Sequence, residues 1–71
     1  MTEREAIKRL KSVEGVINNW LAGKTGMEMY KAMQTESYYG LMEAKDEMNF
    51  AAALAHAEQF IQEHNIESAG R

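Results

Sequence analysis

Two histidines and a cluster of three carboxylates are the side chains of this sequence best suited to chemistry. His56 and His64 are eight residues apart, just over two helical turns, so one helix cannot bring both to the same metal ion. No serine, cysteine or carboxylate stands at a spacing from either histidine that is typical of catalysis. The spacing therefore predicts that the histidines cap a helix or pack in the core.

The three carboxylates are Glu43, Asp46 and Glu47. Two carboxyl groups can act as acid and base only in a pocket that separates their pKa values, and nothing in the sequence indicates such a pocket. The alternating acidic positions and central glycine of a calcium loop are also absent. We interpret the cluster as a solvated helix end, with a contact site for a basic partner as the functional alternative.

The segment Gly23-Lys24-Thr25-Gly26 contains the Gly-Lys-Thr that ends a phosphate-binding loop. That loop needs a glycine five residues before the Gly-Lys pair, where this sequence has Asn18, and it needs a preceding strand. We interpret Gly23 instead as the end of one helix and Thr25 as the cap of the next.

Composition excludes several classes of site. The 71 residues include no cysteine and no proline, so the chain has no disulfide and no thiolate metal ligand. We expect no enzyme activity, no catalytic residue, no metal site and no cofactor. The longest apolar run, residues 50–55, is far shorter than the ~20 residues of a membrane span. Residues 1–5 also lack the pattern of a signal peptide, so we expect a cytoplasmic protein.

The pattern of apolar residues predicts an all-α fold, a small antiparallel three-helix bundle formed by residues 1–66, followed by a flexible tail over 67–71. The first helix should span about residues 3–22. Its capping box would be Thr2 with Glu5. Seven apolar positions form its buried stripe within about 140° of arc, namely Ala6, Ile7, Leu10, Val13, Ile17, Trp20 and Leu21.

The second helix should span about residues 26–45, with Thr25 and Glu28 as its capping box. Its predicted core stripe is Met27, Tyr30, Met33, Tyr38, Leu41 and Ala44. Gly40 and its neighbours Thr35 and Ser37 are weak helix formers. A kink or a break over 35–40 therefore stays open, and it would give four short helices.

The third helix should begin after a turn over residues 46–49, with Asp46 as the preferred cap and Asn49 as the alternative. At its end, Asn65 would adopt a left-handed conformation and bring Ile66 onto Ile61.

The methionines and tyrosines of residues 27–48 point to a protein–protein interaction module acting as a regulator, adaptor or inhibitor. In a continuous second helix, Met29, Tyr39 and Met42 lie off the core stripe and are exposed. Exposed aromatic and methionine side chains are enriched at interfaces. The predicted partner-binding residues are Met29, Tyr39, Met42, Glu43, Asp46 and Glu47. The partner would be another protein or a second copy of the chain.

The alternative function is a nucleic-acid-binding regulator that uses basic residues of the first helix, Arg4, Lys8, Arg9 and Lys11. Residues 1–24 carry five basic and three acidic side chains, whereas the whole chain has a net charge of −3. Acidic second and third helices disfavour a recognition helix, so a nucleic-acid partner is the weaker prediction. We expect no membrane partner and no small-molecule substrate. The size would fit a protein of a virus or mobile element, but no residue pattern indicates that origin.

Overall fold

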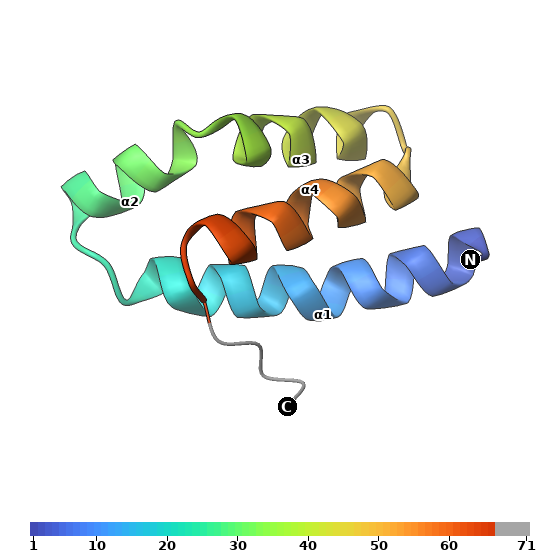
Figure 1. Ribbon diagram of the computed structural model, residues 1–71, viewed down its shortest axis with the longest axis horizontal. Coiled ribbons are helices and arrows are strands. Elements are labelled where there is room, and N and C mark those ends of the chain that lie inside the picture. Colours follow the sequence, from blue (N-terminus) through green and yellow to red (C-terminus); the bar gives the residue numbers. More distant parts are fainter. Residues whose placement is uncertain (67–71) are drawn as a thin grey trace.

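A computed structural model describes residues 1–66, and the predicted tail over 67–71 lies outside the described residues. These described residues form four helices: α1 (Glu3–Ala22), α2 (Gly26–Met33), α3 (Glu36–Asp46) and α4 (Phe50–Glu63) (Figure 1). The prediction of an all-α bundle is confirmed. The count of three helices is wrong, because the second predicted helix is two helices. Across residues 1–66, no helix combines the length and the apolar character that crossing a bilayer requires.

Both predicted capping boxes are present. The Thr2 hydroxyl accepts the Glu5 amide at 3.1 Å, and the Glu5 carboxylate accepts the Thr2 amide at 3.1 Å. Thr25 and Glu28 repeat the arrangement at the start of α2, with distances of 3.3 and 3.1 Å. These hydrogen bonds satisfy amides that a helix N-terminus leaves unpaired, so the sequence marks both helix starts locally.

The end of α4 also follows the prediction. Asn65 has a φ of 52°, and the Ile66 amide donates to the Ile61 carbonyl at 3.0 Å, as a Schellman motif requires. A turn follows α3 over the predicted residues, but the preferred cap of the last helix is wrong and the alternative is right. Asp46 is the last residue of α3 rather than the cap of α4, and the Asn49 side chain caps α4 by accepting the Ala52 amide.

The conformation of Met48 explains why α4 begins after Asn49 and not after Asp46. Its φ is 59°, and it ends α3 in a second Schellman motif, in which the Asn49 amide donates to the Ala44 carbonyl at 2.8 Å. The left-handed conformation is rare for a residue of this type, so no local pattern identifies Met48 as the left-handed residue of the turn.

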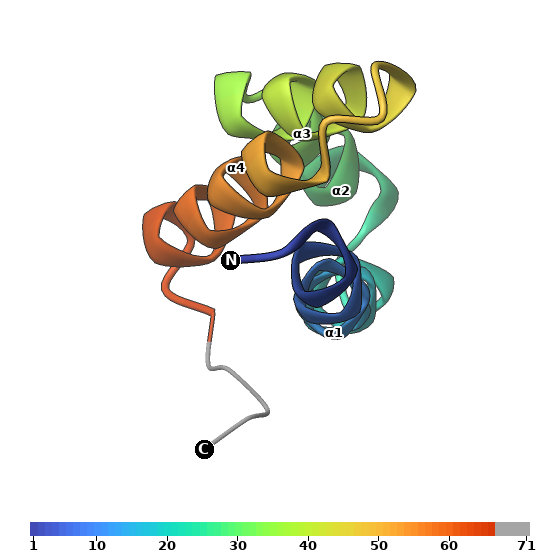
Figure 2. The ribbon, with the colours of Figure 1, turned by 90° about the vertical axis from the view of Figure 1, so that its right-hand side faces the viewer.

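The helix α4 lies between the other helices (Figures 1 and 2). It packs against α1 on one side and α3 on the other, and α2 links α1 to α3 at one end. Within residues 1–66, the backbones of α1 and α3 do not approach each other closely. The principal extents are 36 × 27 × 16 Å, and a helix with its side chains is about 10–12 Å across. The helices therefore form a slab with α1 and α3 at its two edges.

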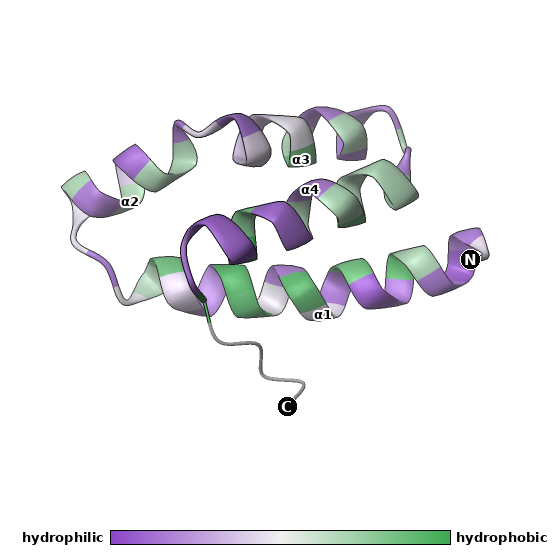
Figure 3. Cartoon of the chain, viewed as in Figure 1, coloured by the Kyte–Doolittle hydropathy of each residue, from purple (hydrophilic) through white to green (hydrophobic). Residues whose placement is uncertain are grey.

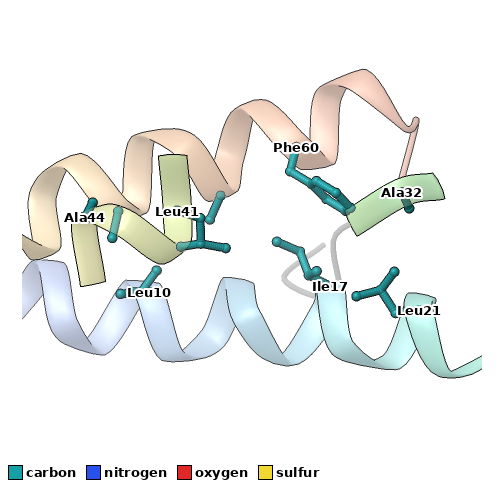
Figure 4. Packing of buried hydrophobic residues seen from close by; sticks show 9 residues of the cluster. Leu10, Ile17, Leu21, Ala32, Leu41, Ala44 and Phe60 are labelled. Carbon is teal, nitrogen blue, oxygen red and sulfur yellow. The ribbon is translucent and has the colours of Figure 1, made fainter. Parts of the chain in front are cut away.

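Phe60 of α4 is the centre of the core and is fully buried. Its ring centroid lies 5.8 Å from that of Trp20 on α1 and 5.8 Å from that of Tyr38 on α3. Figure 4 shows Ile17 and Leu21 of α1 directed toward it. Hydrophobic positions recur along the helices, most densely in the first half of α4 (Figure 3). One α4 ring thus supports both edges of the slab.

Gly40 of α3 lies directly against the His56 side chain of α4. A Cβ atom at this position would lie 2.6 Å from two atoms of the His56 imidazole. Gly40 therefore does not break the helix, as was considered from the sequence, but lies in the middle of α3 and lets His56 pack against its backbone.

Candidate functional site

The break between α2 and α3 determines which side chains reach the surface. Gln34 ends α2 and Thr35 precedes α3. The Thr35 hydroxyl donates to the Ala32 carbonyl at 3.0 Å and makes no capping hydrogen bond to α3. The break thus falls at the first position of the predicted range 35–40, and the side chain that could cap α3 satisfies the end of α2 instead.

This break ends the single helical phase that would relate Tyr30 to Tyr39. Nine residues apart, they would point in opposite directions on an unbroken helix. In the structure they are 63% and 53% exposed. The Tyr39 hydroxyl donates to the Gln34 side chain at 2.5 Å, and Gln34 lies one helical turn from Tyr30. The Tyr39 side chain therefore reaches back across the break to the end of α2, and both tyrosines are exposed.

The same break corrects the predicted positions of four side chains. Met29 and Met42, expected on the exposed side of a continuous helix, are half-buried and pack against the core. Met27 and Tyr30, expected in the core, are exposed. The sequence-based stripe assumed one helical phase from residue 26 to 45, and the phase changes at Thr35.

The acidic residues of α3 lie on the side that faces away from α4. Tyr39, Glu43 and Asp46 are exposed, together with Glu36 in the first turn and Glu47 just after the last. At 100° per residue these five positions fall within about 100° of arc. Lys45 lies outside this arc and pairs with Glu14 of α1.

We use the term outer face for the exposed large apolar residues of α2 together with the exposed residues over 36–47. It consists of Met27, Tyr30, Glu36, Tyr39, Glu43, Asp46 and Glu47. Four of the six predicted partner-binding residues are on it. The sequence pattern missed Met27, Tyr30 and Glu36, and no signal within the sequence could have placed them there without the position of the break.

The two histidines lie apart, as their spacing predicted. His56 packs on Gly40, and His64 lies at the end of α4 with its ring 5.0 Å from Trp20. The His64 Nδ1 lies 3.0 Å from the Phe60 carbonyl oxygen. Because that oxygen can only accept, Nδ1 carries the proton. His64 therefore helps to cap α4, and Trp20 is half-buried at the margin of the core.

A buried hydroxyl was missed by the sequence analysis. Ser37 is 1% exposed and donates to the Glu63 carboxylate at 2.8 Å. This hydrogen bond, with a second one from Gln59, holds the pKa of Glu63 below its ordinary value. The pair joins α3 to α4 from positions 26 residues apart, a distance at which no local pattern indicates a contact. Its burial and single strong partner indicate a structural role.

An open hollow of about 290 Å³ lies at the α2 end of the slab, lined by Trp20, Lys24, Glu28, Lys31, Ala32 and His64. The Lys24 ammonium lies 4.5 Å from the centre of the Trp20 ring, within cation–π distance. The Glu28 carboxylate is held by the capping box of α2. The principal groups lining the hollow therefore already have partners within the chain.

The basic residues of α1 are divided by the structure. Arg9 points toward α4 and pairs with Glu58 at 3.4 Å. Arg4, Lys8 and Lys11 gather around Ile7 on another side of the helix. The four cations predicted for a nucleic-acid partner therefore do not form one stripe.

Comparisons of the chain with known protein families, with curated proteins and with solved structures found no match. Function is therefore inferred from surface chemistry.

Proposed function

We propose that the protein is a non-enzymatic protein–protein interaction module of the cytoplasm, a small regulator, adaptor or inhibitor that binds its partner on the outer face. One observation carries the proposal: three large apolar side chains of α2 and α3, those of Met27, Tyr30 and Tyr39, are exposed. Each is 53% or more exposed in a chain whose core is otherwise well formed. Aromatic and methionine side chains of this kind are enriched at the centres of interfaces.

The charge of the outer face defines the kind of partner. Its four carboxylates are Glu36, Glu43, Asp46 and Glu47, and the exposed Lys31 of α2 lies one helical turn from Met27. Such a surface attracts a basic partner and accelerates its diffusional encounter. The tyrosines would then supply most of the binding energy, since buried aromatic anchors contribute more than charges at a rim.

The shape of the outer face fits a helical partner. The two helices that form it extend over residues 26–46 and present a convex ridge, so a partner helix would lie along it with its apolar side toward Tyr30 and Tyr39. When bound, the module would cover part of its partner's surface and block other contacts there. In this way a small protein without catalytic groups can regulate or inhibit its partner.

Titration with two synthetic peptides tests the proposal. One is an amphipathic helix with lysine and arginine on its polar side, and the other has the same apolar side with glutamate in their place. We expect the basic peptide alone to shift the backbone amide signals of the outer face in two-dimensional NMR spectra. Tyr39→Ala should weaken its binding by about tenfold or more, the effect expected of an aromatic anchor.

Matched charge variants serve as controls. Glu43→Gln with Asp46→Asn should weaken binding of the basic peptide at low salt, whereas Lys8→Gln with Lys11→Gln on α1 should not weaken it. Perturbation confined to another surface, such as the hollow beside Trp20, or identical binding of both peptides would refute the proposed function.

A further inference from the structure

The edge of the slab opposite the outer face carries the opposite charge. Seven exposed residues of α1 fall within about 100° of arc, and we call them the α1 flank. They are Arg4, Lys8, Lys11, Gly15, Asn18, Asn19 and Ala22. The first three are basic and the other four are small or neutral, with no acidic residue among them.

The small residues make the second half of the flank smooth. A Cβ atom added to Gly15 would meet nothing within 4 Å. The flank therefore has a basic half near the N-terminus and a flat half near the end of α1. The outer face has a comparable division, with carboxylates at the α3 end and the larger apolar side chains Met27 and Tyr30 on α2.

The two surfaces match in length and in polarity. The flank belongs to a helix of 20 residues, and the outer face extends over α2 and α3, residues 26–46. At 1.5 Å per residue both are about 30 Å long. The basic end of α1 and the acidic end of α3 lie at the same end of the slab (Figure 1), where Thr2, Glu3 and Met48 line one hollow.

These positions have a geometric consequence for two copies of the chain. A second copy placed beside the first in the same orientation, displaced across the width of the slab, would lay its α1 along the outer face. Its cations would lie toward Glu43 and Asp46, and its Ala22, at the end of α1, would lie toward the side chains of Met27 and Tyr30. Opposite charges would coincide at one end, and large side chains would meet a flat surface at the other.

We infer that the protein associates with further copies of itself head to tail, the α1 flank of one copy binding the outer face of the next. This inference rests on the proposed function of the outer face and names its partner as a second copy of the chain. The two surfaces differ, so the contact is heterologous, and a pair of copies leaves one of each surface unoccupied. Association therefore continues beyond two copies as concentration rises.

The α1 flank favours a protein partner over nucleic acid. It offers three cations, because Arg9 is paired with Glu58 on α4. The chain as a whole has a net charge of −3, which opposes a polyanion but not an acidic surface next to a basic one.

Sedimentation velocity over a range of protein concentrations tests the inference. At low salt the average mass should rise continuously with concentration and exceed that of a dimer. High salt should reverse it, because the screening length falls from about 30 Å at 0.01 M to about 3 Å at 1 M. A monomer at every concentration, or a dimer that grows no further, would overturn the head-to-tail arrangement.

Charge reversal identifies the two surfaces. Glu43→Lys with Asp46→Lys should give a monomer, and so should Lys8→Glu with Lys11→Glu, because each variant has two like-charged edges. An equal mixture of the two variants should associate again, since every contact then joins opposite charges. All four positions are exposed, and circular dichroism checks that both variants are folded. A mixture that stays monomeric would refute the pairing of these surfaces.

Two further outcomes separate this inference from the proposed function. If the native protein is monomeric but the basic peptide binds the outer face, the inference fails and the proposed function stands. If the native protein is monomeric and binds labelled duplex DNA at low salt, with binding lost in Lys8→Glu with Lys11→Glu, the α1 flank serves nucleic acid and the inference is overturned.

Discussion

The two edges of the slab are built from chain segments of nearly equal length, and they fold differently. Residues 3–22 form one helix, whereas residues 26–46 form two. In α1 the strongly apolar residues that the core needs lie on one stripe, and four of them are buried. The α2–α3 segment has apolar residues on several sides, so no single helical phase can bury them all.

The break at Thr35 allows some, but not all, of these apolar side chains to be buried. It turns Met29 and Met42 toward the core and leaves Met27, Tyr30 and Tyr39 exposed. The edge whose apolar residues form one stripe is a single regular helix with a polar outer side. The edge with surplus apolar residues is broken into two helices and exposes some of those residues. The difference between the edges is therefore the origin of the candidate site.

Removing the support that the edges share should have the largest effect. Phe60→Ala would leave a cavity between Trp20 on α1 and Tyr38 on α3. We expect a loss of about 3–5 kcal/mol of unfolding free energy, comparable to the whole stability of a domain this small. Thermal unfolding followed by circular dichroism should show the variant largely unfolded near room temperature.

Met27→Ala is the matched control, because it truncates an exposed apolar side chain of the outer face and should change stability by no more than about 0.5 kcal/mol. A Phe60→Ala protein that keeps a cooperative transition within about 1 kcal/mol of the native value would show that the edges hold each other without α4.

The two glycines within the edge helices offer a sharper comparison. Gly40→Ala should lower stability by about 1–2 kcal/mol, because the new methyl group overlaps the His56 ring by more than alanine's better helix propensity can offset. Gly15→Ala, in open space on α1, should raise stability by about 1 kcal/mol. Chemical denaturation of both variants measures the two signs.

A His56→Ala background tests the cause. With the ring removed, Gly40→Ala should become neutral or stabilising, and the double-mutant cycle gives the coupling between the two positions. If Gly40→Ala destabilises equally in both backgrounds, the close approach of α3 to α4 is not what requires glycine at this position.

A smaller effect on stability should distinguish the ends of α3 and α4. Both helices end with a residue in the left-handed conformation. Met48→Gly should stabilise the protein by about 1 kcal/mol, because a methionine at a φ of 59° carries a steric cost that glycine does not. Asn65→Gly, at a φ of 52°, should gain only a few tenths of a kcal/mol, since asparagine tolerates this conformation. Equal gains at both positions in thermal unfolding would contradict this explanation.

These positions also show what the sequence can predict. The starts of α1 and α2 and the end of α4 were predicted correctly, because the residues that specify them lie within a few positions of one another, as Thr2 and Glu5 do. The turn after α3 was predicted over residues 46–49, and α3 ends at Asp46. The left-handed conformation of Met48 within that turn was not predicted, because methionine gives no local signal for it.

The residues of the candidate site also divide into those that the sequence predicted and those that it did not. Tyr39, Glu43, Asp46 and Glu47 were expected to form an exposed surface, and all four are exposed on α3. Their place depends on α3 alone, which keeps its own phase. Met29 was misplaced because the predicted stripe assumed one helical phase over residues 26–45, whereas α2 ends at Met33 and Met29 packs against the core.

The smallest predicted effect compares how the helices at the two edges begin. Backbone and side-chain hydrogen bonds from Thr2 hold the pKa of Glu5 below its ordinary value of 4.5, and those from Thr25 do the same for Glu28. Since each folded pKa is lower than the unfolded one, this stabilisation is present above pH 4.5 and is lost as the pH falls through the folded pKa values.

Glu5→Gln should therefore flatten the decline of the melting temperature in acid. Glu36→Gln, in a helix whose Thr35 makes no capping hydrogen bond, should flatten it less. Equal flattening by both variants would attribute the acid dependence to net charge and not to the capping boxes.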